Sequence, residues 1–262
     1  MLDLKCWLQP AMVYVALSRV QCLDQLYILE ELPVDKIKPW MDAVEEMKRL
    51  DQLDKERNQL VTFKLVSMNT NSLQAHFQDI LADNELLSST IICLQETWTK
   101  PEDTNTKYPI EERTCHLNSV RRGAGLATYF TKEFTHLKDV TAVTYQITAI
   151  TSDNTTIVNV YRSSDANNQT VIRSLNSIIE GETKSIILCG DFNFCHRDEK
   201  KHPIYLYLIK NHFVPTIQPP KPTHREGRCI DMIWTRYTQS LNAISHLSFV
   251  YYTDHGQFYL TV

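Results

Sequence analysis

The pattern of hydrophobic and polar positions changes at about residue 61 of the 262-residue chain. Beyond that point, short apolar and β-branched runs are separated by polar loops, a pattern that predicts strands of four to eight residues. We predict strands within residues 62–69, 90–96, 123–130, 141–150, 155–162, 184–193, 229–236 and 257–262. Helices are predicted between them, at residues 72–87, 169–179 and 202–213. Strands and helices mixed in this way favour an α/β sandwich with a mixed sheet.

The first sixty residues have a different character. Apolar runs at residues 12–20 and 26–33 predict two short strands. Residues 40–60 are rich in charge and in good helix formers, and Val44 and Met47 belong to only a narrow apolar stripe. We therefore expect this helix to be a linker that is exposed on most sides. The chain is predicted to consist of three parts, residues 1–39, the helical linker at 40–60 and a larger domain at 61–262.

The charge of the chain is slightly negative. It carries 27 Lys and Arg residues against 31 Asp and Glu residues, which gives a net charge of −4. This balance excludes an overall basic nucleic-acid binder, although an enzyme can rely on a metal ion and a local basic patch. Residues 196–228, and a second group that includes Arg113, His116, Arg121 and Arg122, are candidates for such a patch.

Cysteine usage and hydropathy indicate the compartment. Seven cysteines without regular spacing argue against a disulfide framework, and the lack of a C-x-x-C pair argues against a zinc site. The sequence shows neither a signal peptide nor an apolar run of about 18 residues. We therefore expect a soluble, intracellular protein without a membrane partner.

Polar residues of catalytic type lie at the ends of most predicted strands of the larger domain. They are Asn69, Glu96, Tyr161, Asp191, Asn193, Asp231, Asp254 and His255. Each alone has an ordinary structural explanation, because Asp and Asn favour turns and polar residues commonly end strands. Asp191 and Asn193 are separated by one residue, so in a strand their side chains would project from the same face. Together, these residues, four of them carboxylates, indicate a shared site.

The residue types of this predicted site suggest its chemistry. Carboxylates and carboxamides, without cysteine or clustered histidine, are the ligands that a hard cation prefers. The simplest such ion is Mg²⁺, for which Mn²⁺ can substitute. With the histidine of the Asp254–His255 pair beside them, these groups suggest hydrolysis of a phosphate ester, in which the metal polarises the phosphoryl group and a carboxylate activates water.

Seven short motifs occur in order along the larger domain. They are SMNTNSL at 67–73, LQETW at 94–98, GAGLA at 123–127, NVY at 159–161, GDFN at 190–193, CIDMIW at 229–234 and TDH at 253–255. Through these motifs the chain, from about residue 63 to its last residue, resembles the endonuclease/exonuclease/phosphatase superfamily. The resemblance implies a four-layer α/β sandwich, with two mixed β-sheets packed face to face and helices outside. It also implies Mg²⁺-dependent cleavage of phosphodiesters or phosphomonoesters.

The resemblance implies metal ligands and groups that bind the substrate. Glu96 is similar to the principal metal carboxylate of the family, with Asn69 close beside it, and Asp254 would support the metal. Asn193 would hold a phosphate oxygen or the nucleophile. Tyr161 would hydrogen-bond the phosphate and help to stabilise the transition state.

The resemblance also implies the acid–base groups. Asp191 in GDFN would orient or deprotonate the attacking water. His255 would contact the scissile phosphate, either as a general acid or as a charge stabiliser. Asp231 would orient His255 through a hydrogen bond between carboxylate and imidazole.

Two further similarities suggest which branch of the superfamily is involved. The QETW, GAGLA and TDH motifs are most similar to the endonucleases of mobile elements. YVALSR at 14–19 resembles the last motif of Pif-family DNA helicases, in which the arginine, here Arg19, contacts the nucleotide's γ-phosphate. A helicase tail followed by such an endonuclease resembles the transposase of Helitron-like elements. We therefore expect a DNA endonuclease that resides in the nucleus and is preceded by a helicase remnant.

Several departures leave alternatives open. Residue 71 is Asn where abasic-site nucleases typically have Asp, and Arg162 begins Arg-Ser-Ser where nucleases often have Ala-Pro. No G-x-x-x-x-G-K-[ST] loop is present, so ATP hydrolysis is not expected. The alternatives are a phosphatase or lipid phosphodiesterase on the same scaffold, or a decayed, inactive remnant that only binds DNA.

Overall fold

The computed structural model describes residues 45–49, 63–195, 197, 200–217, 221–237 and 243–262. The chain divides into two units, Met1–Leu60 and Val61–Val262. In the first unit, residues 45–49 form an exposed helical segment inside the predicted linker. The predicted helicase tail, with Arg19, and the rest of the linker lie outside the described residues. The assignment of residues 1–39, 40–60 and 61–262 to three domains stays a prediction.

The first sheet of the larger unit is mixed. Within the described residues its strand order is β11-β12-β1-β2-β4-β3. Strands β1 and β2 run parallel, whereas the other neighbours are antiparallel. The strands are β1 (Lys64–Asn69), β2 (Ile91–Gln95), β3 (Thr114–Asn118), β4 (Leu126–Phe130), β11 (Ile244–Phe249) and β12 (Gly256–Thr261).

The second sheet is also mixed. Within the described residues its strand order is β5-β6-β7-β8-β10-β9, and β7 and β8 are the parallel pair. The strands are β5 (Thr135–Thr141), β6 (Tyr145–Thr151), β7 (Thr155–Arg162), β8 (Ser185–Asp191), β9 (Val214–Pro215) and β10 (Asp231–Arg236).

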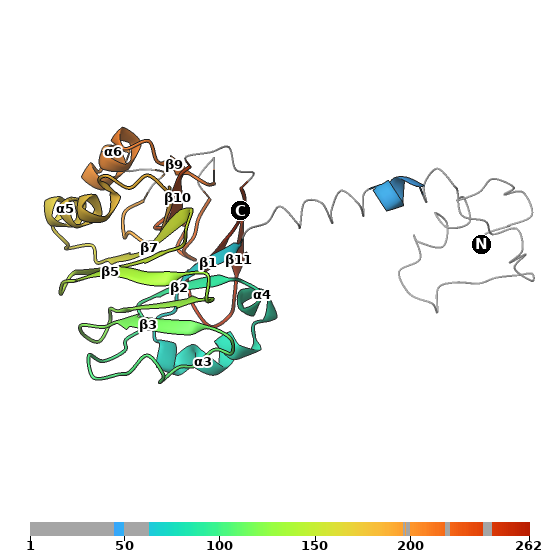
Figure 1. Cartoon of the computed structure of the whole chain (residues 1–262). Helices are drawn as coiled ribbons and strands as arrows, with labels where there is room; N and C mark the ends of the chain where they lie inside the picture. The colour runs from blue at the N-terminus through green and yellow to red at the C-terminus, as the bar shows by residue number, and fades with distance from the viewer. Residues whose placement is uncertain (1–44, 50–62, 196, 198–199, 218–220, 238–242) are drawn as a thin grey trace, which may run out of the picture. The chain divides into compact units, whose positions relative to one another are not determined.

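Helices cover the outer faces of both sheets (Figure 1). The first sheet is covered by α3 (Leu73–Ala82) and α4 (Asn84–Leu87), and the second by α5 (Asn168–Ile179) and α6 (Pro203–Lys210). The Ser72 hydroxyl caps the start of α3, and the Asn167 side chain caps the start of α5. The predicted helix at 72–87 is divided at Asp83, which ends α3 in an extended conformation and caps α4.

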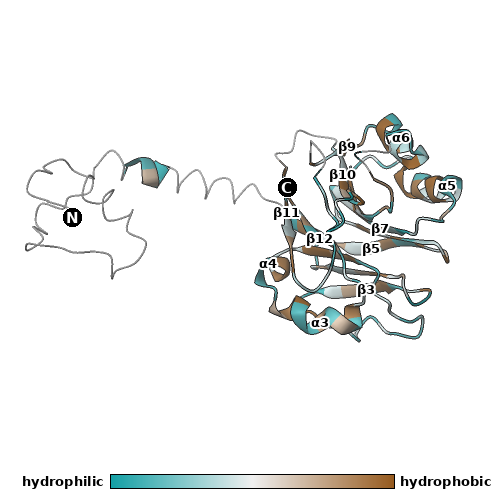
Figure 2. Ribbon diagram, turned by 180° about the vertical axis from the view of Figure 1, so that it is seen from behind, coloured by the Kyte–Doolittle hydropathy of each residue, from teal (hydrophilic) through white to brown (hydrophobic). Residues whose placement is uncertain are grey.

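The alternation of side chains along the strands produces three apolar layers. Leu65 of β1 and Ile187 of β8 lie in the layer between the two sheets. Val66 packs outward against α3 and α4, and Ile186 packs outward against α5 and α6. Apolar residues are accordingly concentrated inside the sandwich (Figure 2). The predicted fold, a four-layer α/β sandwich of two mixed sheets, is confirmed.

All eight predicted strands are present, and four further strands complete the sheets. The additional strands are β3, β5, β9 and β11, which form the edges of the two sheets. Their burial patterns are largely exposed or intermediate, unlike those of the central strands. An edge strand needs fewer apolar residues, so the hydrophobic pattern that identifies central strands does not identify it.

Gly190 permits a close approach of two strands directly beside the polar end of β8. Its φ of +139° lies in a region that disfavours other residues, and a Cβ atom here would lie 1.9 Å from the Val160 carbonyl oxygen of β7. Backbone, not a flexible side chain, fills that space. The position of Asp191 therefore depends on a glycine at residue 190.

We expect Gly190→Ala to lower the free energy of unfolding by at least about 2 kcal/mol, because the substitution combines overpacking with backbone strain. Urea unfolding followed by circular dichroism would measure the change. Gly181→Ala is the matched control: Gly181 has a φ of +76° but no atom within 4 Å of the added Cβ. The free energy of unfolding of this variant should fall by only about 1 kcal/mol, because alanine disfavours the left-handed backbone but meets no other atom. Equal losses in both variants would contradict the steric argument.

Candidate active site

Three of the predicted site residues form one row across the second sheet. Asp191 of β8 is paired in register with Tyr161 of β7 on one side and with Asp231 of β10 on the other. Residues paired in register have side chains on the same face of a sheet. Cys189, two residues before Asp191, packs in the layer between the sheets, so this row also faces the first sheet.

The first sheet contributes the groups that face this row. Asn69 ends β1 and is paired with Gln95, which ends β2 and is followed by Glu96. His255 directly precedes β12, which is antiparallel to β1. The Thr253 hydroxyl donates to the Asn69 carbonyl oxygen at 2.9 Å and joins the segment before β12 to the end of β1. The strand ends of the two sheets therefore meet at a single site.

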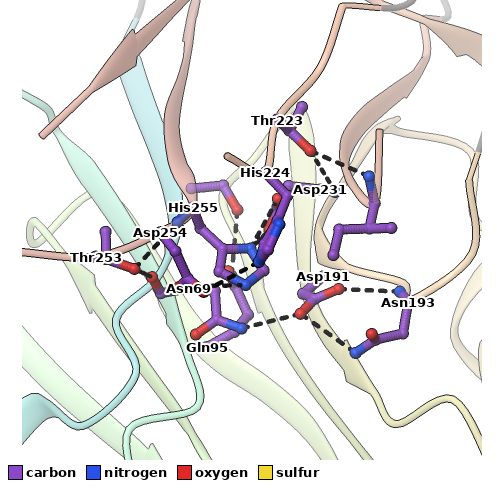
Figure 3. A network of polar contacts seen from close by, with 12 residues as sticks. Asn69, Gln95, Asp191, Asn193, Thr223, His224, Asp231, Thr253, Asp254 and His255 are labelled. Carbon is purple, nitrogen blue, oxygen red and sulfur yellow. Dashed lines mark hydrogen bonds and ion pairs between the residues drawn. The ribbon is translucent and has the colours of Figure 1, made fainter. Parts of the chain in front are cut away.

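Asp191 is held by hydrogen bonds from both sheets (Figure 3). Its Oδ2 accepts from Asn69 Nδ2 at 2.9 Å and from Asn193 Nδ2 at 3.3 Å, and its Oδ1 accepts from the Asn193 backbone N–H at 2.9 Å. Asn193 has a φ of 50° and lies in a turn after the strand. The predicted pairing of Asp191 and Asn193 is present, but the explanation by strand alternation was wrong: a turn brings the two side chains together.

The Asp191 carboxyl has a pKa well above its ordinary value of 3.8. Burial of this side chain, together with the negative charge of Asp231, raises the pKa to about 7, against the lowering effects of His255 and the Asn69 hydrogen bond. A carboxyl group that titrates near neutral pH is suited to accept a proton from water.

His255 and Asp231 form a buried pair. Nδ1 of His255 lies 2.9 Å from both carboxylate oxygens of Asp231. Burial alone would lower the pKa of His255, but the Asp231 charge and hydrogen bond outweigh it and raise the pKa to about 9. The backbone N–H of Asp231 donates to the Thr223 hydroxyl at 3.0 Å, which anchors the start of β10. The imidazole is therefore protonated and oriented at neutral pH.

Asp254 lies at the other nitrogen of His255. Its Oδ1 is 4.0 Å from His255 Nε2, while its Oδ2 is 3.0 Å from Nε2 of His224. The backbone N–H of Glu226 donates to His224 Nδ1 at 3.1 Å, so the proton of a neutral His224 is on Nε2. His224 therefore donates to Asp254 and fixes the direction of its carboxylate.

Sequence reasoning missed His224. It forms an isolated β-bridge with His255, and the two rings pack edge to face with centroids 4.7 Å apart. It precedes Asp254 by 30 residues and belongs to none of the seven motifs. The only available signal was a histidine within the histidine-rich stretch between residues 196 and 228.

Glu96 and Tyr161 lie on the opposite side of the row from Asp231. Glu96 is partly exposed and has a left-handed backbone with a φ of 47°. Burial raises the pKa of Tyr161, and the charges of Glu96 and Asp191 raise it further, which keeps the phenol protonated. Its hydroxyl donates to the Gly123 carbonyl oxygen at 3.2 Å. Tyr161 is thus a hydrogen-bond donor at neutral pH.

Arg162 supports the turn that carries Asn193. Its guanidinium is buried and donates to the Phe192 carbonyl oxygen at 2.9 Å and to Asn168 Oδ1 at 3.0 Å. The Asn193 side chain in turn donates to the Arg162 carbonyl oxygen at 3.0 Å. The departure from Ala-Pro at this position therefore has a structural role, which the sequence reasoning did not anticipate.

The predicted basic patch is only partly available. Arg113 donates to the carbonyl oxygens of Leu87 and Ser89, and His116 pairs with Asp139, so both are engaged within the protein. Arg121 and Arg122 are exposed, and the charge of Arg121 acts on Tyr161. Arg121 therefore lies near the site, although its Nε also donates to the Val143 carbonyl oxygen.

The donor set of the site fits a divalent cation. Ligand atoms of Asp191, Asp231 and His255 lie within 4.8 Å of one another, as do those of His224, Asp254 and His255. The charge of Glu96 adds to that of Asp231 in raising the pKa of Asp191. A bound cation would offset this accumulation of negative charge, and oxygen donors suit a hard ion.

The three predicted metal ligands do not form one group by themselves. Glu96 and Asn69 lie on the side of Asp191, which hydrogen-bonds Asn69 directly. Asp254 lies beyond His255, where it pairs with His224. The eight predicted site residues nonetheless lie around one row of side chains between the two sheets.

The family model described as "Endonuclease/Exonuclease/phosphatase family" matches residues 66–255. The chain therefore belongs to this family, and its membership supports hydrolysis of phosphodiester bonds. Enzymes of this family generally depend on a divalent metal, in agreement with the donor set. No curated protein matches the chain.

Several solved structures share the fold. The endonuclease domain of TRAS1, a telomere-specific non-LTR retrotransposon, is 12% identical with a TM-score of 0.61, and the match covers 76% of this chain and 97% of that chain. The Neisseria 3′ phosphatase NExo, bound to a product DNA hairpin, is 16% identical with a TM-score of 0.57 over 76% and 98% of the two chains. An AP endonuclease from Archaeoglobus fulgidus is 13% identical with a TM-score of 0.56 over 76% and 98%.

Among the described residues, the helices are too short or too polar to cross a membrane. The longest helix in this part of the chain, α5, extends from Asn168 to Ile179 and packs its apolar side on the second sheet. Its apolar residues are therefore used inside the domain.

The raised pKa of Asp191 predicts a pH-dependent stability for the metal-free protein. Between its ordinary pKa of 3.8 and its folded value of about 7, the folded state holds a proton that the unfolded state lacks. The free energy of unfolding therefore falls as the pH rises through this range. Asp191→Asn removes the titrating group, so from pH 5 to pH 8 the variant should gain on the order of 2 kcal/mol relative to wild type.

Urea unfolding at both pH values in EDTA would measure this gain. Asp153→Asn, at an exposed residue in the turn between β6 and β7, is the control and should behave like wild type at both pH values. A stability difference for Asp191→Asn that does not change with pH would show that the carboxyl group has an ordinary pKa.

Proposed function

We propose that this chain is a Mg²⁺-dependent DNA endonuclease of the type found in Helitron-like or LINE-type mobile elements. It would nick one strand and leave a 3′-hydroxyl. The observation that carries the proposal is the adjacency of two buried groups that each join the two sheets, the Asp191–Asn69 cluster and the His255–Asp231 pair. Asn69, Asn193 and Tyr161 are the substrate-binding groups of the proposal.

Asp191 is the proposed base. The N–H groups of Asn69 and Asn193 fix its carboxylate in one orientation, so it can direct an attacking water toward phosphorus. Its raised pKa allows it to accept the proton that the water loses. Asn193, from the same turn, is proposed to hold a phosphate oxygen or the attacking water.

His255 and Tyr161 are the proposed donors to the phosphate. His255 is protonated and held by Asp231 through Nδ1, which leaves Nε2 to stabilise the charge on the phosphate or to protonate the leaving oxygen. Tyr161 remains protonated and can donate to a phosphate oxygen in the transition state. Both donors belong to the region that contains Asp191.

Glu96 and Asn69 are proposed to hold the metal on the side of Asp191, and Asp254, beyond His255, is proposed to support it. When bound, Mg²⁺ would polarise the phosphoryl oxygen and stabilise developing negative charge, and Mn²⁺ would be able to replace it. The preference for Mg²⁺ rests on the oxygen-rich donors of these side chains. His224 is proposed to position Asp254 through the hydrogen bond from its Nε2.

A DNA substrate is supported by two observations. Arg121 is exposed near Tyr161, and with the adjacent, exposed Arg122 it provides positive charge for a phosphate backbone. The similar structures include a retrotransposon endonuclease domain and an enzyme bound to a DNA hairpin. Residence in the nucleus is proposed from this substrate. A helicase remnant that includes Arg19 is also proposed, because residues 14–19 read YVALSR.

A phosphatase is the second candidate, favoured by the similarity to a 3′ phosphatase. A lipid phosphodiesterase would use the same acid–base groups with different surface loops. The inactive, DNA-binding remnant is the least favoured alternative, because the hydrogen bonds of Asp191 and His255 are intact.

Plasmid nicking tests the proposed function. Purified protein should convert supercoiled plasmid to the open circle in Mg²⁺, and EDTA should abolish the reaction. Asp191→Ala and His255→Ala should each lower the rate at least about 100-fold, a typical scale for acid–base and charge-stabilising groups. Asp153→Ala is the control and should retain the wild-type rate. Asp153 is exposed and precedes β7, whereas the site residue Tyr161 lies near the other end of this strand.

Each result separates the candidates. A near-normal rate in either site variant would remove that residue from its proposed role. Failure of the folded wild-type protein to nick plasmid, with hydrolysis of 3′-phosphorylated DNA, an inositol phosphate or sphingomyelin instead, would favour the second candidate. DNA binding without metal and without turnover would favour the inactive remnant.

His224→Phe tests the positioning role of His224. The ring contact with His255 is retained, but Asp254 loses its hydrogen bond. Loss of such a supporting partner of a metal ligand typically costs about 10–100-fold in metal affinity or activity. The Mg²⁺ concentration for half-maximal nicking should rise accordingly.

His246→Ala is the matched control for His224→Phe. His246 also pairs with one carboxylate, Glu85, at 2.8 Å, but it lies on the edge strand β11. This control should keep the wild-type Mg²⁺ dependence. An unchanged Mg²⁺ dependence in His224→Phe would instead contradict the proposed positioning of Asp254 by His224.

A further inference from the structure

A second group of metal-binding side chains lies at one edge of the sandwich. His116 belongs to β3, the edge strand of the first sheet, whereas His136 and Asp139 belong to β5, the edge strand of the second. The two strands are in contact (Figure 1). None of the three residues belongs to the proposed catalytic site.

Both imidazoles are directed at one carboxylate. His116 Nε2 lies 2.6 Å from Asp139 Oδ2, and His136 Nε2 lies 3.3 Å from Asp139 Oδ1. The rings stack with centroids 3.9 Å apart and planes at 22°. One nitrogen or oxygen atom from each residue lies within 4.8 Å of the others. Two nitrogen donors and one carboxylate therefore lie together where the edge strands β3 and β5 meet.

A bulge in β5 creates this arrangement. In a regular strand, His136 and Asp139 would point to opposite faces because they are three residues apart. The register with β6 shifts between His136 and Lys138, which inserts one extra residue. The extra residue reverses the alternation, so both side chains lie on the side of His116.

The carboxylate has further support from its own sheet. The Thr148 hydroxyl of β6 donates to Asp139 Oδ1 at 2.9 Å. Hydrogen-bonded carboxylates of this kind are typical of the groups that surround metal ligands. The Thr141 hydroxyl of β5 also donates to Asn118 Oδ1 of β3 at 2.7 Å, so the edges of the two sheets are fixed near the cluster.

The donor separations are close to those that a tetrahedral ion requires. Zn²⁺ is held at about 2.0–2.2 Å by nitrogen and carboxylate donors, which places neighbouring donors about 3.3 Å apart. His136 Nε2 and Asp139 Oδ1 already have this separation, whereas His116 Nε2 lies 2.6 Å from the other oxygen, Oδ2, and would have to move outward by about 0.7 Å. Because an imidazole nitrogen binds a metal in the plane of its ring, one ring must turn out of the stack, and the His136 side chain, which is 37% exposed, can do so to admit an ion from solvent.

We propose that His116, His136 and Asp139 form a binding site for a borderline transition-metal ion, represented by Zn²⁺. Water completes the coordination, since three protein donors leave a position open. The imidazole ligands favour Zn²⁺ over Mg²⁺, which prefers oxygen donors. Because the ligands come from both sheets, the bound ion ties the edge strands together and stabilises the sandwich.

Calorimetric titration of the full chain with Zn²⁺, in saturating Mg²⁺, tests this proposal. Wild type should bind Zn²⁺ at this site, and His136→Ala should lose that binding or weaken it at least about 100-fold. Mutation of a residue that only hydrogen-bonds a metal ligand costs up to about 100-fold in metal affinity, and removal of a ligand should cost at least as much. His246→Ala, which removes an exposed histidine paired with Glu85, should match wild type. Asp139→Asn is a second variant that keeps an oxygen but removes the charge, and its binding should also weaken.

Thermal unfolding provides a readout that is independent of catalysis. Zn²⁺ should raise the Tm of wild type and of His246→Ala, and the rise should be lost in His136→Ala. Excess chelator should reverse the rise. Equal Zn²⁺ stoichiometry, affinity and Tm response in wild type and His136→Ala would overturn the proposal and assign the observed binding to other residues, such as His224 and His255.

Discussion

The structure depends on hydrogen bonds that cross from one sheet to the other at the buried Asp191 carboxyl. A carboxylate removed from water is costly unless donors replace its hydration. Asn69 from the first sheet supplies one donor, and the turn at Asn193 supplies others. His255, from the segment before β12, faces Asp231 in the same way. The two sheets are therefore fixed at their polar ends as well as by the apolar layer between them.

This constraint explains the unusual local features near the site. Gly190 has a backbone that other residues disfavour, and Glu96 and Asn193 have positive φ angles. The burial of the Arg162 guanidinium is compensated by a carbonyl oxygen of the adjacent turn and by the Asn168 side chain, which accept its N–H groups. Such departures from local preference concentrate at functional sites, where the surrounding structure compensates for them. The raised pKa of Asp191 has a similar origin, because burial and the nearby charge of Asp231 destabilise its ionised form.

The sequence predicts the centre of this molecule better than its edges. Central strands such as β8 are buried along their whole length, so their apolar runs are evident, whereas β5 is mostly exposed. The residues of the short motifs, which the sequence singles out, are brought together by the fold, while their roles stay predictions. His224 is not, because its role depends on a bridge to His255 that only folding creates. The proximity of Asp191 and Asn193 was expected from strand alternation, but a turn after β8 places the two side chains together.

The edge cluster of His116, His136 and Asp139 shows the same limit most clearly. The lack of C-x-x-C pairs argued against a zinc site, but that argument concerns cysteine ligands, which this cluster does not use. Its residues come from two strands that the hydrophobic pattern does not identify, and a bulge brings two of them to the same side. Neither the bulge nor the contact between β3 and β5 follows from local sequence. Edge strands have a weak hydrophobic pattern, so the sequence does not identify them or their bulges. A bulge redirects side chains, which lets residues of two distant strands meet.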